Sequence, residues 1–229
     1  MTRWQVEQRF GDALELFQAA PYELVGPTAV FCSVSRPALV LGNGQRSSLL
    51  CWREIVASNL QVVRRRSGGG GVLIAPDQQV WVELWIPHKD LLWQEDVLKA
   101  AVWLGNAWAS SLTSLGVSNV SVHTGRMMHT RWSGQICFAG LGPGEVSIDE
   151  HKAVGIAQRR TREGVMFECS ALLGFDAETT VALMLSGEEE RKEALIYLER
   201  TVYPGNPWIT KEELEESFLD QILALDVFE

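Results

Sequence analysis

The sequence predicts an α+β fold in which helices flank a mixed or antiparallel sheet. Short β-type segments recur between residues 29 and 169 and are grouped around one long amphipathic helix. The C-terminal part reads as helical and contains two capping-box patterns. Strands that are grouped around a central helix and followed by further helices are typical of the α+β class.

The first half of the chain contains one predicted helix and several predicted strands. Trp4, Val6, Phe10, Leu14 and Phe17 follow roughly helical spacing, so we expect a helix near the N-terminus. The strands are expected at residues 29–34, 38–41, 60–64 and 80–86, with another beginning at Val72. Within the last of these ranges the side chains alternate with period two, and two tryptophans indicate that the second face is covered as well.

A strong amphipathic helix is predicted over residues 97–115. Its apolar residues recur every three or four positions, and Gly116 fits a C-terminal cap. Further strands are expected at residues 117–122, 135–139, 145–148, 153–157 and 165–169. Capping-box patterns at residues 186–189 and 210–213 predict helices in the remaining chain.

The composition bounds the class of protein. The chain has 229 residues, of which 46% are hydrophobic, so a substantial core is feasible. Its formal net charge is −9, which argues against a general nucleic-acid binder. The four cysteines form no C-x-x-C pair, and neither a signal peptide nor an apolar run of about 18 residues is visible. We therefore expect a reduced, cytoplasmic, soluble protein without a membrane partner or a metal site.

The run from Arg64 to Val72 contains three arginines, a serine and four glycines in succession. Glycine loses more conformational entropy on folding than any other residue, so such a run persists mainly where the backbone approaches another group closely. The arginines add fixed positive charge and planar donors. The segment therefore predicts a loop that holds an anionic or acyl-adenylate-like ligand through backbone N–H groups.

Three motifs resemble those of the lipoate–protein ligase and octanoyltransferase superfamily, which also includes biotin–protein ligases. Residues 64–72 are similar to its R-R-x-S-G-G-G-A-V motif, and residues 152–160 are similar to its K-x-x-G-S-A-Q-R segment. Residues 37–45 are similar to the P-x-V-x-x-G-x-x-Q stretch that precedes the glycine loop. The motifs occur in family order, and this makes their combination more specific than a single glycine run.

The resemblance implies a biotin/lipoate ligase-like catalytic domain over residues 1–175, with a helical extension over residues 176–229 packed on it. It implies transfer of a lipoyl or octanoyl group to a lysine of a lipoyl-carrier protein, either a lipoyl domain or a glycine-cleavage H-like protein. Lys152 is then a catalytic residue that stabilises the charge developing in acyl transfer. The implied substrate-binding residues are Arg64, Arg65, Ser67, Gly68, Gly69, Gly70, Gly71 and Gly155.

Cys137 separates two forms of this chemistry. It lies fifteen residues before Lys152 and is followed by Phe138, an arrangement similar to the nucleophilic cysteine of one octanoyltransferase branch. A thiolate accepts an acyl group from a carrier thioester and passes it to a lysine without ATP. A buried, inert cysteine explains the residue equally well. The ligases carry a G-R-N-D-type segment, whereas residues 142–145 have an acidic residue but no Asn, so ATP and Mg²⁺ enter only if the protein is a ligase.

Two positions depart from the family pattern. Ile74 stands where the family has a His after the glycine loop, and Glu168 stands where it has the His of an H-G-S/T segment. These losses indicate a different acyl group, a different acceptor or lost catalysis. A non-catalytic acyl- or carrier-binding relative is therefore the alternative function. The neighbouring Cys169 is interpreted as a packed core thiol.

The basic segment at residues 159–162 is a candidate for docking of the carrier protein. Such a charge run is commonly a solvated face, so both interpretations stay open. If the segment docks the carrier, replacing Arg159 and Arg160 with Glu weakens carrier modification and leaves small-ligand binding intact.

Overall fold

The computed structural model describes residues 3–19 and 26–225 of the chain. Its main element is a seven-stranded sheet in the order β1-β2-β6-β10-β9-β8-β7. The strands are β1 (Gln5–Gly11), β2 (Thr28–Val34), β6 (Gln79–Pro87), β7 (Val120–Val122), β8 (Val146–Ile148), β9 (His151–Arg160) and β10 (Gly164–Leu172). β1 and β2 are parallel and the other neighbours are antiparallel, which confirms the predicted mixed sheet.

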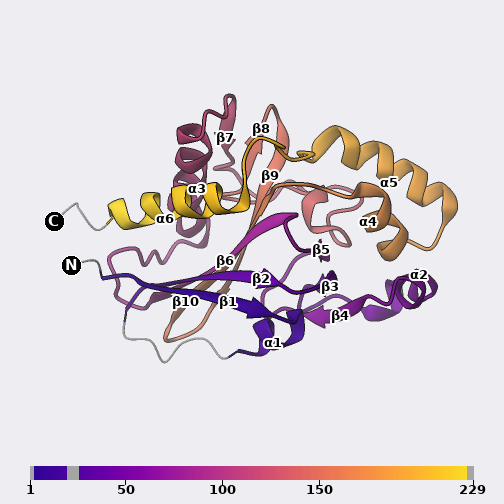
Figure 1. Cartoon of the computed structure of the whole chain (residues 1–229), viewed down its shortest axis with the longest axis horizontal. Coiled ribbons are helices and arrows are strands. Elements are labelled where there is room, and N and C mark those ends of the chain that lie inside the picture. The colour runs from indigo at the N-terminus through magenta and orange to yellow at the C-terminus, as the bar shows by residue number, and fades with distance from the viewer. Residues whose placement is uncertain (1–2, 20–25, 226–229) are drawn as a thin grey trace.

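The large sheet is covered on both faces. Helices α3 (Val97–Ser114) and α6 (Lys211–Ala224) pack on one face, as Figure 1 shows. A small sheet in the order β4-β3-β5 packs on the other, together with α1 (Ala13–Gln18). Its strands are β3 (Ala38–Leu41), β4 (Gln61–Arg64) and β5 (Val72–Ile74).

The alternation along β6 produces this layered arrangement. Val80, Val82 and Leu84 belong to the core beneath α3 and α6, whereas Trp81 belongs to the core beneath the small sheet. All four side chains are buried, which confirms that both faces of this strand are covered. In the α3–α6 layer, aromatic rings from the two helices stack at a centroid distance of 3.7 Å.

The remaining helices build a third core beside the small sheet. They are α2 (Trp52–Ala57), α4 (Ala177–Met184) and α5 (Glu188–Thr201), and short 3₁₀ helices lie at Ser47–Leu49 and Cys137–Ala139. Leu183 and Leu198 of this layer are buried against Leu41 and Phe138. The helices after residue 175 thus contribute to two of the cores, while the division of the chain into two domains stays a prediction.

The predicted N-terminal helix is confirmed only over α1, which contains Leu14 and Phe17, and is wrong over residues 5–11. Residues 5–11 form β1, which pairs with β2 over its whole length, and α1 begins only at Ala13, after the capping residue Asp12. Helical spacing would place Val6 and Phe10 on one buried face, yet their side chains are 42% and 76% exposed. Backbone pairing with a strand more than twenty residues away determines this segment, and local periodicity does not contain that partner.

The predicted strand at residues 135–139 is also wrong. Its last three residues form a 3₁₀ helix, and Ile136 makes only an isolated bridge to Gly71. The carbonyl groups of Cys137 and Gly140 accept hydrogen bonds from the side chain of Lys152 instead of from a neighbouring strand. A buried cation therefore shapes this turn.

Of the predicted helix ends, two are confirmed and one is wrong. Gly116 follows α3 with a φ of +85°, and Thr210 forms a capping box with Glu213 at the start of α6. Helix α5 begins after Gly187 without a side-chain cap, so the pattern that began at Ser186 does not form a capping box.

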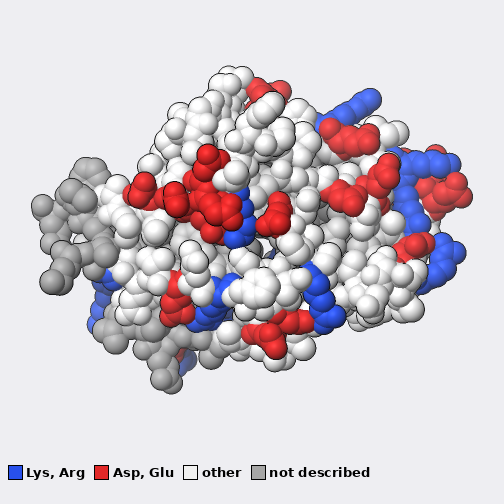
Figure 2. Space-filling model, viewed as in Figure 1, with Lys and Arg blue, Asp and Glu red and all other residues white. Residues whose placement is uncertain are grey.

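The surface carries its negative charge unevenly. Figure 2 shows acidic side chains gathered over α6, the helix that contributes Glu212, Glu215, Glu216 and Asp220. Such a face repels polyanions. Within the described residues, none of the helices has the length and apolar composition needed to cross a membrane.

Candidate active site

The glycine loop is held against the turn at residues 135–139. The N–H of Gly71 donates to the carbonyl of Gln135 at 2.7 Å, and the N–H of Cys137 donates to the carbonyl of Gly71 at 2.9 Å. A Cβ at Gly70 would lie 2.6 Å from the backbone nitrogen of Cys137. Glycine is required there because two backbone segments pass each other in contact.

Arg65 fixes the shape of the loop from inside. Its side chain is 4% exposed, and its Nη2 donates to the carbonyls of Gly68 and Gly70 at 2.6 and 2.9 Å. Its Nε donates to Ser67 Oγ at 3.0 Å. Gly69 has a φ of +97°, a conformation that glycine adopts without strain. Hydrogen bonds from Arg65 thus define the conformation of the loop.

Arg64 has a different position. Its Nη1 donates to the carbonyls of Gly42, Asn43 and Gln45, which lie in the motif before the glycine loop. The side chain of Gln45 extends this brace, because its Nε2 donates to the carbonyl of Gln135 at 2.9 Å. Arg64 thus holds two motifs together from outside the pocket described below.

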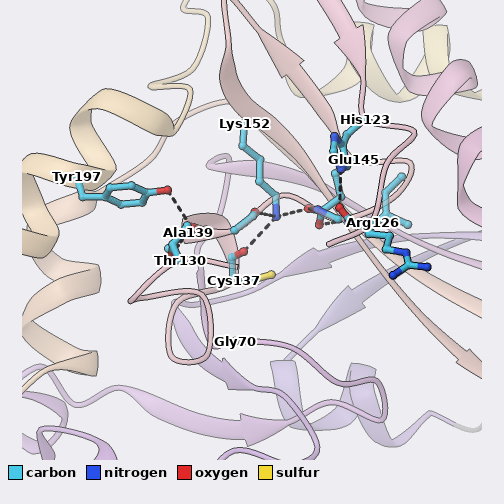
Figure 3. Close-up of polar contacts among 12 residues, drawn as sticks. Gly70, His123, Arg126, Thr130, Cys137, Ala139, Glu145, Lys152 and Tyr197 are labelled. Atoms are coloured by element: carbon cyan, nitrogen blue, oxygen red, sulfur yellow. Dashed lines mark hydrogen bonds and ion pairs between the residues drawn. The ribbon is translucent and has the colours of Figure 1, made fainter. Parts of the chain in front are cut away.

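Lys152 lies at the centre of the polar contacts in Figure 3. Its side chain is 4% exposed, and Nζ is 2.6 Å from Glu145 Oε2. Nζ also donates to the carbonyls of Cys137 and Gly140, at 3.1 and 2.8 Å. The ammonium therefore has three acceptors, one charged and two neutral, and it fixes the turn that carries the thiol.

Glu145 completes this cluster. Oε2 also accepts from the N–H of Gly142, and Oε1 accepts from the N–H of Ile156 at 3.1 Å. Both oxygens are thus engaged, as buried charged groups require. In the sequence Glu145 is visible only as the acidic residue of the segment at 142–145, and it was not among the predicted site residues.

A pocket lies between the glycine loop, the small sheet and strands β9 and β10. Its lining is mainly apolar, and its cavity volume is about 50 Å³. Cys137 lines one part of it, next to Phe138 and Gly155, and its side chain is partly exposed. The apolar wall comes from Phe17, Val40, Val72, Ile74 and Trp81. Its apolar lining, with a thiol at one part of the wall, suits contact with an acyl chain whose reactive end reaches that thiol.

The family model described as the lipoyl protein ligase A/B catalytic domain matches residues 10–199. The chain belongs to this family. A bi-partite lipoate protein ligase from Thermoplasma acidophilum, solved in a study of an archaeal lipoylation system with its E2 lipoyl domain, is similar with a TM-score of 0.75. Its identity is 14%, over 97% of this chain and 83% of that chain.

Two further solved structures share the fold of the lipoyl protein ligase A/B family. Lipoate-protein ligase A bound with ATP has a TM-score of 0.58 at 14% identity, over 96% of this chain and 93% of that chain. LipL1 of P. falciparum in complex with lipoate has a TM-score of 0.63 at 11% identity, over 96% and 62% of the two chains. No curated protein sequence matches the chain. At these identities the likeness establishes the shared fold.

Both departures from the family pattern, Ile74 and Glu168, line the same pocket. Glu168 is 8% exposed, and burial raises the pKa of its carboxyl, while the hydrogen bond from Ser67 and the charge of Arg65 oppose that shift. Its Oε2 accepts a hydrogen bond from Ser67 Oγ and lies 3.7 Å from Arg65 Nε. Glu168 therefore contacts the glycine loop of this chain through Ser67 and Arg65.

Three of the ten predicted site residues line the pocket, whereas Arg64, Ser67, Lys152 and the four successive glycines are not part of its lining. Cys137, Arg65 and Gly155 line the pocket, and Lys152 contacts the backbone of Cys137. Cys169 is 1% exposed, and burial raises the pKa of its thiol, as expected of a core cysteine. Arg160 lies at the other end of β9 from Lys152, over the ring of Trp93 at 4.3 Å. The docking role of the basic segment stays a prediction.

Proposed function

We propose that this member of the family transfers an octanoyl or lipoyl group to a lysine of a lipoyl-carrier protein through a thioester on Cys137. One observation carries the proposal. The partly exposed Cys137 lines an apolar pocket, and the ammonium of Lys152 donates a hydrogen bond to the backbone carbonyl of Cys137. A cysteine that served only to fill the core would be enclosed, as Cys32 and Cys169 are.

The first step is exchange between two thiols. The thiolate of Cys137 attacks the carbonyl carbon of an acyl thioester on a donor carrier, and the bond to the donor sulfur breaks. The acyl group is then on Cys137, and the donor leaves as a free thiol after taking the proton that Cys137 gave up. No oxidant and no nucleotide is needed, because one thioester replaces another.

The second step forms the amide. The acceptor lysine attacks the Cys137 thioester as a neutral amine, so its ammonium first releases one proton. The carbon–nitrogen bond forms, the carbon–sulfur bond breaks, and a second proton from the nitrogen returns to the sulfur of Cys137. The enzyme is regenerated with a free thiol, and one proton in all passes to solvent.

Lys152 supports both steps through its charge and position. The tetrahedral intermediates carry negative charge on the former carbonyl oxygen, which a cation near the sulfur stabilises. Two of the three partners of Nζ are neutral carbonyls. A developing oxyanion can replace one of these, while Glu145 keeps the ammonium in place.

ATP and Mg²⁺ do not fit the residues present. The segment at residues 142–145 has no Asn, and both oxygens of Glu145 are already engaged by Lys152, Gly142 and Ile156. A carboxylate that neutralises a buried lysine is a poor ligand for a metal–nucleotide complex, because binding the metal would unpair the lysine. The proposed reaction therefore contains no acyl-adenylate.

The test is transfer of an octanoyl group from an octanoyl-carrier thioester to a separate lipoyl domain, with and without ATP. The expected result is modification of the lipoyl-domain lysine that does not depend on ATP and is lost in Cys137→Ser. Cys51→Ser is the matched control, because Cys51 is also partly exposed but contacts Arg191, away from the pocket. Modification that requires ATP, or that survives Cys137→Ser, contradicts the thioester route. Acyl binding without transfer favours the non-catalytic alternative.

A further inference from the structure

Two polar atoms in the pocket have no hydrogen-bond partner in the part of the chain that the structure describes. Glu168 Oε1 and Ser170 Oγ are buried and accept or donate no hydrogen bond within the described residues. The Glu168 side chain is more than nine-tenths buried, and both residues line the pocket that also holds Cys137. Buried polar atoms are normally paired, so an unpaired carboxylate oxygen that faces a pocket has free capacity for a hydrogen-bond donor on a ligand.

The two residues form one polar stripe on the floor of the pocket. They lie two positions apart on β10, so their side chains point to the same face of the sheet. On the neighbouring strand β9, their register partners are Gly155 opposite Ser170 and Ala157 opposite Glu168. These small residues leave the stripe uncovered. The large side chain beside it is Trp81, opposite Ser170 on β6.

The position of the free oxygen is fixed. Ser67 Oγ donates to Glu168 Oε2, and Arg65 Nε lies 3.7 Å from the same oxygen. Both groups belong to the glycine loop, so rotation of the carboxyl to pair Oε1 would break these contacts. Glu83 is the register partner of Glu168 on β6, so its side chain lies on the same face of the sheet.

A saturated acyl chain fits this floor poorly. It would displace water from Glu168 Oε1 and Ser170 Oγ without forming a hydrogen bond to either atom. Binding would then carry the full free-energy cost of desolvating both atoms. A chain with a hydroxyl or thiol hydrogen at this depth would satisfy the carboxylate oxygen. Its oxygen or sulfur would also accept from the Ser170 hydroxyl.

We propose that the acyl group preferred by this protein is a medium-length chain that carries a hydroxyl or thiol, which donates to Glu168 Oε1 and accepts from Ser170 Oγ. This proposal rests on the pocket being the acyl site of the proposed function. It explains the replacement of the family His by Glu168 as a change of acyl specificity, and Ile74 keeps the opposite wall apolar.

The test compares binding of matched free acids by calorimetry, which needs no acyl transfer. The pairs are octanoic acid against a series of hydroxyoctanoic acids, and lipoic acid against dihydrolipoic acid. We expect the donor-bearing member of each pair to bind more tightly, on the order of 10- to 100-fold for the best hydroxyl position. Equal binding within both pairs, or failure of all the acids to bind, overturns the proposal.

Variants assign the preference to the stripe. Glu168→Leu is expected to abolish it, and Glu168→Gln to retain part of it through the amide oxygen. Ser170→Ala is expected to weaken it and serves as the test if Glu168→Leu fails to fold. Glu199→Gln, on the exposed face of α5, is the control and keeps the full preference. A preference that survives both Glu168→Leu and Ser170→Ala overturns the assignment.

The outcomes separate this proposal from the transfer reaction. Selective binding of hydroxy or thiol acids without acylation of Cys137 supports the specificity and contradicts the transfer. Acylation of Cys137 by octanoyl and hydroxyoctanoyl thioesters at equal rates supports the transfer and contradicts the specificity.

Discussion

Two buried carboxylates, Glu145 and Glu168, belong to the surroundings of Cys137, and their own partners differ. Glu145 has both oxygens occupied, by an ammonium and two backbone N–H groups. Glu168 has one oxygen occupied by Ser67 and one that has no hydrogen-bond partner among the described residues. A fully paired buried charge stabilises one backbone arrangement, whereas a half-paired one has free capacity for a ligand. This difference is the basis of our proposal that the first cluster positions the thiol and the second recognises the acyl chain.

The largest effect is expected at the paired cluster. Lys152→Ala leaves Glu145 buried without its cation and should lower the free energy of unfolding by about 3–5 kcal/mol. Urea denaturation measures this, and acyl transfer should be lost at the same time. The double variant Lys152→Met with Glu145→Gln should recover most of the stability but none of the activity. A loss of stability within error of zero would show that the ion pair does not hold the turn.

A smaller effect is expected where the glycine loop meets the turn of Cys137. Gly70→Ala places a Cβ 2.6 Å from the backbone of Cys137 and should cost about 1–3 kcal/mol. Gly68→Ala is the matched control, because a Cβ there meets nothing within 4 Å. Thermal unfolding of both variants checks the contrast. Equal costs would mean that the two segments are not in contact.

Two serines sharpen the comparison within the pocket. Ser67 is paired with Glu168, so Ser67→Ala should cost about 1–2 kcal/mol, because it also removes a partner from the carboxylate. Ser170 Oγ has no partner within the described residues, so Ser170→Ala should change stability by less than about 0.5 kcal/mol. Chemical denaturation of the two variants decides this. The reverse order would remove the distinction between a satisfied and an unsatisfied group.

The smallest effect concerns pH. Burial raises the pKa of the Glu168 carboxyl, so the folded state binds its proton more tightly than the unfolded state does. The stability that this proton confers is fully present below the unfolded pKa of Glu and is lost as the pH rises through the raised folded value. Arg65, Arg66 and Glu83 are the other charged groups near this carboxyl.

Glu168→Gln removes this dependence. Relative to the variant, the wild type should therefore lose stability between pH 4 and neutrality, by an amount that levels off above the raised pKa. Unfolding midpoints measured across this range check the sign. A wild type that gained stability relative to Glu168→Gln as the pH rose would indicate a carboxylate that is fully paired, like Glu145.

Local pattern predicted the parts of the fold that depend on neighbouring residues. The alternation with period two identified β6, and the amphipathic spacing identified α3. In both elements the pattern of buried side chains repeats regularly along the segment, so it is visible in the local sequence. β1 and the turn at Cys137 were misassigned, because a distant strand and the side chain of Lys152 determine them. Such partners are fixed only when the chain is folded.

The candidate site divides in the same way. Sequence motifs identified the glycine loop and Lys152, and the position of Cys137 before Phe138 and fifteen residues before Lys152 identified the thiol. The role of Glu145 was missed, because its ion pair depends on the turn that places residues 142–145 over β9. The sequence marked Glu168 as a departure, but only the fold places its free oxygen beside Ser170, in the pocket of Cys137.

The most direct test of the account is to trap the acyl group on Cys137. The wild type, Cys137→Ser and Cys51→Ser are each mixed with an octanoyl-carrier thioester, without acceptor. The intact mass of each protein is then measured by mass spectrometry, and peptide mapping locates the acyl group. The account predicts one acyl group, on the peptide that contains Cys137, in the wild type and Cys51→Ser and none in Cys137→Ser. An adduct on another residue, or an adduct that persists in Cys137→Ser, would contradict it.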